Sequence, residues 1–158
     1  MKKQLYIPWI LVSIIFISMI VLIIYSLDAV KITKIDFENL LKKDTNNVEY
    51  FIDEYTESSR SVFIRGWIIE KNIHTKNLSY NILCKNINSG NVYAIKTFIE
   101  QRKDVTETMN SKNNYDLSGF NSKILKFLLP EDGEYKLILY FHHNDKNIFV
   151  DLPYVFYK

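Results

Sequence analysis

The chain has 158 residues with 20 lysines and arginines against 18 aspartates and glutamates, which gives a formal net charge of +2. With Lys2 and Lys3 set aside, the basic residues number 18 and equal the acidic ones, so the sequence lacks the basic stripe that nucleic-acid binding requires. Its one cysteine, Cys84, excludes a disulfide within the chain, and an apolar core must therefore hold the fold.

The first predicted element is the run 5–27, which contains no charged residue. A helix needs about 20 apolar residues to cross the hydrocarbon core of a bilayer, and this run is long enough. It exceeds the roughly 7–15 residues of a signal-peptide core, and no small-residue cleavage site follows it. The run therefore predicts an uncleaved transmembrane signal anchor. The alternative is a buried helix of a soluble protein.

Charges at the two ends of this run predict its orientation. Lys2 and Lys3 precede the run, whereas Asp28 follows it and the next cations are Lys31 and Lys34. The positive-inside rule then places the N-terminus in the cytoplasm and the C-terminal part outside, in a single-pass protein of the plasma membrane. We expect four segments: a cytoplasmic tip over 1–4, the span over 5–27, a juxtamembrane connector over 28–44 and an exported domain over 45–158.

Short strand-like runs fill the exported domain, about 8–12 residues apart and separated by polar turns. The strongest is 61–70, where Val62, Ile64, Gly66 and Ile68 share one face. The predicted strands, besides a short one near Ile35 and Phe37 in the connector, are 48–53, 61–70, 78–87, 92–99, 120–129, 134–142 and 148–157. Seven or eight strands with almost no helix signal predict an all-β, immunoglobulin-like antiparallel sandwich. The alternative is a small barrel.

Several positions test this prediction. In the run 78–87, Cys84 alternates with Tyr80 and Ile82 and should face the core as a buried thiol. Tyr93, Ile95 and Ile99 should share one face of the run 92–99. The run 134–142 is apolar on both faces and should be a central strand, whereas Pro153 predicts an edge position for the last strand.

The long stretch 101–118 carries the first candidate binding residues. Asp104 and Glu107 have capping-box spacing, so we expect Asp104 to be the N-cap of one helical turn. Arg102 then has one of two roles. It locks this loop by pairing with Asp104 or with an exposed row of carbonyl groups, or it grips carboxylate or sugar oxygens of a ligand in a fork.

A second candidate lies on the strand 61–70. Trp67 shares a face with Phe63, Arg65 and Ile69, opposite the predicted core side. That face is either a second layer of core or an aromatic platform for sugar rings with Arg65 at its edge.

The sequence offers little support for catalysis. His142 and His143 are adjacent, so on a strand their side chains point to opposite faces and cannot form a metal pair. No Cys/His spacing for zinc, no nucleophile elbow and no phosphate loop is present, so we predict neither metal nor cofactor. Paired catalytic carboxylates remain an alternative, because sequence alone does not place them.

Four short motifs carry a resemblance. They are Gly66-Trp67, Arg102-x-Asp104-Val105, Tyr115 with Gly119-Phe120, and Gly133-x-Tyr135. In this order they resemble a β-sandwich module of bacterial cell-envelope proteins, found beside membrane spans or attached to glycan-processing proteins. The resemblance implies a fold and brings no catalytic residues with it.

We therefore expect a non-catalytic accessory or binding module at the bacterial cell envelope, tethered to the bilayer through 5–27. Its partner would be a cell-surface glycan or a membrane protein. The candidate binding residues are Arg65, Trp67, Arg102, Asp104 and Tyr115. The alternatives are a purely structural subunit of a larger membrane complex and, less favoured, a glycan-modifying enzyme.

Overall fold

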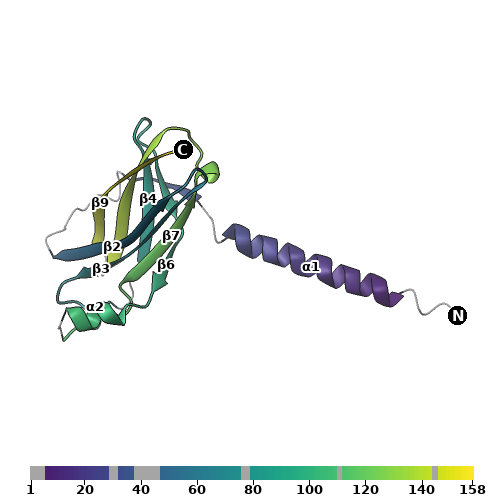
Figure 1. Ribbon diagram of the computed structural model, residues 1–158, viewed down its shortest axis with the longest axis horizontal. Helices are drawn as coiled ribbons and strands as arrows, with labels where there is room; N and C mark the ends of the chain where they lie inside the picture. Colours follow the sequence, from purple (N-terminus) through teal and green to yellow (C-terminus); the bar gives the residue numbers. More distant parts are fainter. Residues whose placement is uncertain (1–5, 29–31, 38–46, 76–78, 110–111, 144–145) are drawn as a thin grey trace. The chain divides into compact units, whose positions relative to one another are not determined.

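The computed structural model describes every residue except 1–5, 29–31, 38–46, 76–78, 110–111 and 144–145 (Figure 1). The chain divides into two compact units, Met1–Lys31 and Ile32–Lys158.

The first unit contains helix α1 (Tyr6–Asp28), which coincides closely with the uncharged run. The Ser13 and Ser18 hydroxyls donate to the carbonyls of Trp9 and Ile15 at 2.9 and 2.8 Å, so both are satisfied within the helix. In the described part of the chain, no helix combines the length and hydropathy needed to cross a membrane. The predicted span is thus a helix, but its crossing of a bilayer lacks structural support.

The second unit is a sandwich of two antiparallel sheets, as the sequence predicts (Figure 1). Its described residues form nine strands, more than the seven or eight expected, and two separate sheets in place of the alternative barrel. The five-stranded sheet has the order β1-β5-β4-β8-β9, and the four-stranded sheet has the order β2-β3-β7-β6.

The strands of the five-stranded sheet are β1 (Ile32–Ile35), β4 (Ser79–Asn86), β5 (Val92–Ile95), β8 (Glu134–His143) and β9 (Lys146–Tyr157). Those of the four-stranded sheet are β2 (Val48–Glu57), β3 (Ser61–Glu70), β6 (Thr97–Glu100) and β7 (Gly119–Leu125). The described residues of the unit also form two short helices: α2 (Lys103–Thr108) and the 3-10 helix η2 (Lys126–Leu128).

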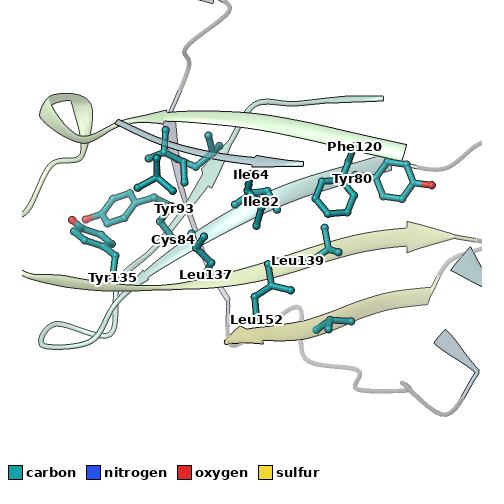
Figure 2. Close-up of a cluster of buried hydrophobic side chains, with 14 of the residues drawn as sticks. Ile64, Tyr80, Ile82, Cys84, Tyr93, Phe120, Tyr135, Leu137, Leu139 and Leu152 are labelled. Carbon is teal, nitrogen blue, oxygen red and sulfur yellow. The ribbon is translucent and has the colours of Figure 1, made fainter. Parts of the chain in front are cut away.

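The main core lies between the sheets and follows from the period-two pattern of the strands. Figure 2 shows Ile64 and Phe120 of the four-stranded sheet facing Ile82, Leu137 and Leu139 of the five-stranded sheet. All five are fully buried. Burying each such side chain stabilises the fold by roughly 1.5–3 kcal/mol, which lets this domain dispense with a disulfide.

Three specific predictions are confirmed. Cys84 is fully buried in this core (Figure 2), and burial raises the pKa of its thiol, which therefore stays protonated and unreactive. Strand β8 has a neighbour on each side, so it is an interior strand. Pro153 lies in β9 at the edge of the sheet, where the register shifts opposite Leu137.

The prediction of one strand over 92–99 is wrong. The chain changes sheets at Lys96: β5 pairs with β4, whereas β6 pairs with β7. Thr97 stabilises this corner, because its Oγ1 accepts from the Ile82 amide at 2.8 Å and donates to the Ile95 carbonyl at 3.1 Å. Tyr93 and Ile95 share one face as predicted and are buried in the core, but Ile99, predicted to share that face, is 49% exposed on the edge strand β6.

Two other strands differ from prediction in length. Strand β2 continues to Glu57 through a bulge at Asp53, and Tyr50 is more exposed than the alternation suggests. The strand predicted over 120–129 ends at Leu125, where η2 begins. Lys126 anchors that turn, because its buried Nζ donates to Oε1 of Glu57 at 2.6 Å and to the carbonyl of Tyr157 at 2.7 Å.

Strand β1 lies in the segment predicted as a connector. Ile32 to Ile35 pair with Ile95 to Val92, so β1 is an edge strand of the five-stranded sheet, and the compact unit begins at Ile32 instead of residue 45. The rest of the predicted connector, after Phe37, lies outside the described residues.

The outer face of the five-stranded sheet carries a second apolar cluster, and we call it the closed face. Its fully or almost fully buried members are Leu83, Val92, Ile138 and Phe149, and Ile35, Phe37, Ala94 and Tyr140 pack against them. Phe37 meets Phe149 edge-on with ring centroids 4.9 Å apart. The strand alternation thus buries apolar side chains on both sides of this sheet.

Candidate binding face on the four-stranded sheet

The outer face of the four-stranded sheet, which we call the open face, collects most of the candidate residues. Strand register sets two neighbouring rows across it. One row is Phe51, Trp67, Gly119 and Glu100, and the next is Glu54, Arg65, Asn121 and Phe98. The residues that alternate with them along the same strands, such as Ile64 and Phe120, point to the other side of the sheet and fill the core. Trp67 and Arg65 therefore point away from the core, as the sequence predicts.

Aromatic side chains mark the two edges of the open face. Phe51 on β2 is 58% exposed and Phe98 on β6 is 45% exposed. Because neighbouring strands lie about 4.8 Å apart, these edge strands are separated by roughly 14 Å across the face. The Nζ of Lys96 lies 5.6 Å from the centroid of the Phe98 ring, a cation–π distance.

A strip of hydrogen-bonded polar groups runs from the central strands of this face to the edge strand β6. Arg65 Nε donates to Oε2 of Glu100 at 2.6 Å, and Asn121 Nδ2 donates to the other oxygen, Oε1, at 2.6 Å. Glu100 raises the pKa of the Arg65 guanidinium through this hydrogen bond and its charge. Both oxygens of Glu100 are thus engaged, and the Arg65 side chain, 45% exposed, is oriented by a single pair.

Arg102 lies over the same face in a much more enclosed position. Its guanidinium pairs with Asp104, with Nη2 2.7 Å from Oδ2, and with Asp53 in the bulge of β2. Its side chain is 13% exposed. The hydrogen bonds from Arg102 hold the pKa of the Asp104 carboxyl below its usual value, and the carboxylates raise the pKa of Arg102. Arg102 thus links the loop after β6 to the edge strand β2, and we call this pair of contacts the lock.

Gly119 provides the space for that lock. A Cβ at this position would lie 2.6 Å from Cγ of Arg102 and 2.8 Å from the carbonyl oxygen of Glu100, which is too close for any other residue. Arg102 and Gly119 are therefore needed together for this packing arrangement.

The expected N-cap at Asp104 is wrong. Helix α2 starts at Lys103, its N-cap is Arg102, and no side chain caps it. The Val105 amide already bonds the Arg102 carbonyl at 3.1 Å, and the Arg102 amide donates to Asp116 at 2.7 Å, so the turn begins two residues earlier. The Asp104 carboxylate is consequently available for Arg102.

Helix α2 covers one end of the open face (Figure 1). A third apolar cluster lies there, in which Ile69, Val105 and Tyr115 are buried and Trp67 and Met109 pack against them. Trp67 therefore has one side in packing contacts and is only partly exposed. It belongs both to this small core and to the rim of the face.

Tyr115 is the one predicted binding residue that the structure keeps off the surface. It is almost fully buried, and its hydroxyl accepts the amide hydrogen of Asn72 at 3.1 Å, where Asn72 has a positive φ of 65°. Its own amide donates to Oγ1 of Thr106 at 2.8 Å. Tyr115 thus secures the 101–118 loop and does not face a ligand.

The structure brings together Arg65, Trp67, Arg102 and Asp104 and adds residues that sequence reasoning missed. These are Phe51, Asp53, Phe98, Glu100 and Asn121. Alternation with Val48, Tyr50 and Ile52 already placed Phe51 on the opposite face from the core, so that signal was present. Phe98, Glu100 and Asn121 required knowledge of which strands are neighbours.

The charges on this face nearly cancel. Two arginines, Arg65 and Arg102, oppose three carboxylates at 53, 100 and 104: Arg65 pairs with Glu100, and Arg102 pairs with Asp53 and Asp104. The rows beside them add Lys123 and Glu54, one of each sign. The face therefore has no strong potential that would attract a polyanion or a polycation.

A groove of about 670 Å³ lies elsewhere, along β1 and the β4–β5 hairpin. Its polar wall includes Ser89 and Asn91, but both already hydrogen-bond to Glu131, the latter at 2.5 Å. These bonds, led by that from Ser89, lower the pKa of the Glu131 carboxyl. The groove is thus built around a structural clasp that joins the hairpin to the turn before β8.

The described residues contain no group of three or more His, Cys, Asp or Glu side chains that could hold a metal ion. His142 Nδ1 lies 2.9 Å from Oδ1 of Asn147, and His74 Nδ1 accepts from the Asn114 amide at 2.9 Å, so both rings have structural partners. The side chain of His143 lies outside the described residues. Comparison with protein-family models, curated proteins and solved structures gave no match.

Proposed function

We propose that the chain is a single-pass membrane protein of the bacterial cell envelope whose external β-sandwich is a non-catalytic binding module. The observation that carries the proposal is the apolar surface of α1. Its described side chains, from Trp9 to Ile23, are all exposed, and all but Ser13 and Ser18 are apolar. A helix that is apolar all round needs an apolar surrounding on every side.

The sequence supports a bilayer as that surrounding. The uncharged run over 5–27 reaches the roughly 20 apolar residues that a span requires. The cations at 2 and 3 favour a cytoplasmic N-terminus, which puts the sandwich outside the plasma membrane.

We further propose that the sandwich is immunoglobulin-like, because its strand order supports that topology. If β2 to β9 are taken as strands A, B, C, C′, D, E, F and G, then β2-β3-β7-β6 corresponds to the ABED sheet. The order β5-β4-β8-β9 then corresponds to C′CFG, with β1 added at the edge.

A local feature agrees with this assignment. Tyr135 lies near the start of β8, and its hydroxyl donates to the Glu131 carbonyl four residues earlier at 2.7 Å. This is the geometry of the tyrosine corner at the start of strand F. Leu137, two residues on, occupies the place where many such domains have a disulfide cysteine, and it is fully buried.

The open face supports a binding role, because two large aromatic side chains and an arginine are exposed together there. A second candidate function is that of a structural subunit of a membrane complex. The end of the unit where η2 lies supports it. There Lys126 bonds the carbonyl of Tyr157, and Phe127 and Tyr157, both highly exposed, flank that contact.

The experiment that tests the proposal is a topology assay on the full chain. A reporter that is active only outside the cytoplasm, fused after Lys158, should be active, and the protein should resist extraction from membranes by alkaline carbonate. A reporter active only in the cytoplasm, or a mature N-terminus near residue 28, would contradict the anchored topology.

A further inference from the structure

We infer that the open face binds an uncharged saccharide chain, with Phe51 and Phe98 as stacking platforms and Arg65 as a hydrogen-bond donor. The inference deepens the proposed function and rests on it, because it names the ligand class and the surface of the binding module.

The aromatic rings of the open face are available for stacking on a ligand. Phe51 and Phe98 stand at opposite edges of a face whose central strands are β3 and β7. Large aromatic side chains are normally buried, and exposed ones that share a surface mark interaction sites. A separation of roughly 14 Å between their strands is wider than one pyranose ring, so the pair suits a chain of sugars.

Polar groups between the two rings have hydrogen-bonding capacity that the fold does not use. Within the described part of the chain, Arg65 donates one hydrogen bond, from Nε to Glu100. Its other N–H groups can therefore donate to hydroxyl oxygens. Asn121 uses Nδ2 toward Glu100, which leaves its Oδ1 as an acceptor for a hydroxyl proton. Donor and acceptor side by side match the dual character of sugar hydroxyls.

The charge balance of the open face also favours an uncharged ligand. Because the carboxylates and guanidiniums of the open face nearly cancel, a phosphate-rich or otherwise strongly anionic polymer gains little there. An uncharged polyhydroxyl ligand has no such requirement. The charge balance therefore favours neutral hexose or N-acetylhexosamine chains over nucleic acids and polyanionic glycans.

The arrangement of polar and aromatic groups on the open face favours a saccharide over a protein partner. Protein interfaces have an apolar centre and a polar rim. On the open face, Arg65 and Asn121 on the central strands β3 and β7 are polar and bond Glu100 on the edge strand β6, while the most exposed rings, Phe51 and Phe98, lie on the edge strands. A protein partner would have to desolvate that strip, whereas sugar hydroxyls replace its water.

The experiment uses the full chain in detergent micelles on an array of neutral hexose and N-acetylhexosamine oligosaccharides. Phe51→Ala, Phe98→Ala and Arg65→Ala should each weaken binding to the array at least about tenfold, which corresponds to about 1.4 kcal/mol. Two matched controls should bind as the parent does: Phe127→Ala, an exposed ring on η2, and Arg60→Ala, an exposed arginine in the β2–β3 turn.

Three outcomes would overturn the inference. The parent chain binding no neutral oligosaccharide is one, and equal losses in the open-face and control variants are another. The third is a photo-crosslinker at position 51 that captures a protein in cells instead of a glycan. Failure of the topology assay is a separate result, because array binding by detergent-solubilised protein does not depend on which side of a membrane the sandwich lies.

Discussion

The two outer faces of the sandwich differ, although both are made by the same alternation of side chains. On the closed face, Leu83 and Ile138 point outward from their sheet and are nevertheless buried. On the open face, Phe51 and Phe98 point outward and remain exposed. A buried outward face contributes stability, whereas an exposed aromatic face contributes little stability and is available to a ligand.

The physical reason is what covers each face. Ile35 and Phe37, which belong to β1 and the residues after it, pack on the closed face. Helix α2 covers only one end of the open face, over Ile69 and part of Trp67. Short segments outside the main strands thus decide which sheet surface becomes core and which remains available.

The largest expected effect comes from removing β1. A fragment of residues 45–158 should be less stable than one of 29–158 by roughly 3–5 kcal/mol, since it loses three half-buried apolar side chains, Ile32, Ile35 and Phe37. Urea denaturation of both fragments, followed by far-UV circular dichroism, measures this. Equal stability would show that β1 does not close the face, and a helical spectrum from both would contradict the sandwich.

A pair of alanine substitutions compares the faces directly. Leu83→Ala on the closed face should cost about 2–5 kcal/mol, because it leaves a cavity in packed surroundings. Phe51→Ala on the open face should cost less than about 1 kcal/mol, because most of its ring is already in water. Unfolding free energies of the fragment 29–158 test the pair. If Phe51→Ala were as costly as Leu83→Ala, the open face would have to be a structural surface.

Within the open face, substitution of Arg102, which locks the loop, should reduce stability more than substitution of Arg65, which we assign to binding. Arg102→Ala should cost about 1–3 kcal/mol, because it leaves Asp53 and Asp104 without their partner. Arg65→Ala should cost at most about 1 kcal/mol, as expected for an exposed pair.

A double-mutant cycle checks the lock. The double variant Arg102→Ala/Asp104→Ala should cost less than the sum of the single changes, since both remove one interaction. A stable Arg102→Ala protein that has lost binding would instead assign Arg102 to the ligand.

The smallest expected effect is a pH dependence at the clasp beside the closed face. Glu131 has a lowered pKa, from an ordinary value of 4.5, because Ser89, Tyr93 and Asn91 donate to its carboxylate. A lowered folded-state pKa means that the stabilisation is complete above the unfolded value and is lost as pH falls through the folded one. Glu131→Gln should therefore reduce stability at neutral pH, and its difference from the parent should shrink below about pH 4.5. Urea titrations at neutral pH and at about pH 3 measure that difference, and a pH-independent difference would contradict the assignment.

The sequence alone determined the features that depend on local alternation and on residue chemistry. Strand β3 has the predicted bounds, and Val62, Ile64 and Ile68 face the core, because period two leaves no other way to bury them. Cys84 and Pro153 lie where a buried thiol and a residue without an N–H are tolerated. The pairing of Arg102 with Asp104 followed from two residues that are close in the chain.

Tertiary structure decided everything that depends on which strands become neighbours. The break at Lys96, which sends β5 and β6 to different sheets, has no local signal, because the alternation continues through it. Asp53 reaches Arg102, and Glu100 reaches Arg65, only because β2, β3, β7 and β6 form one sheet. The contrast between a closed and an open face also arises at this level, since an outward side chain is buried or exposed by segments remote in sequence.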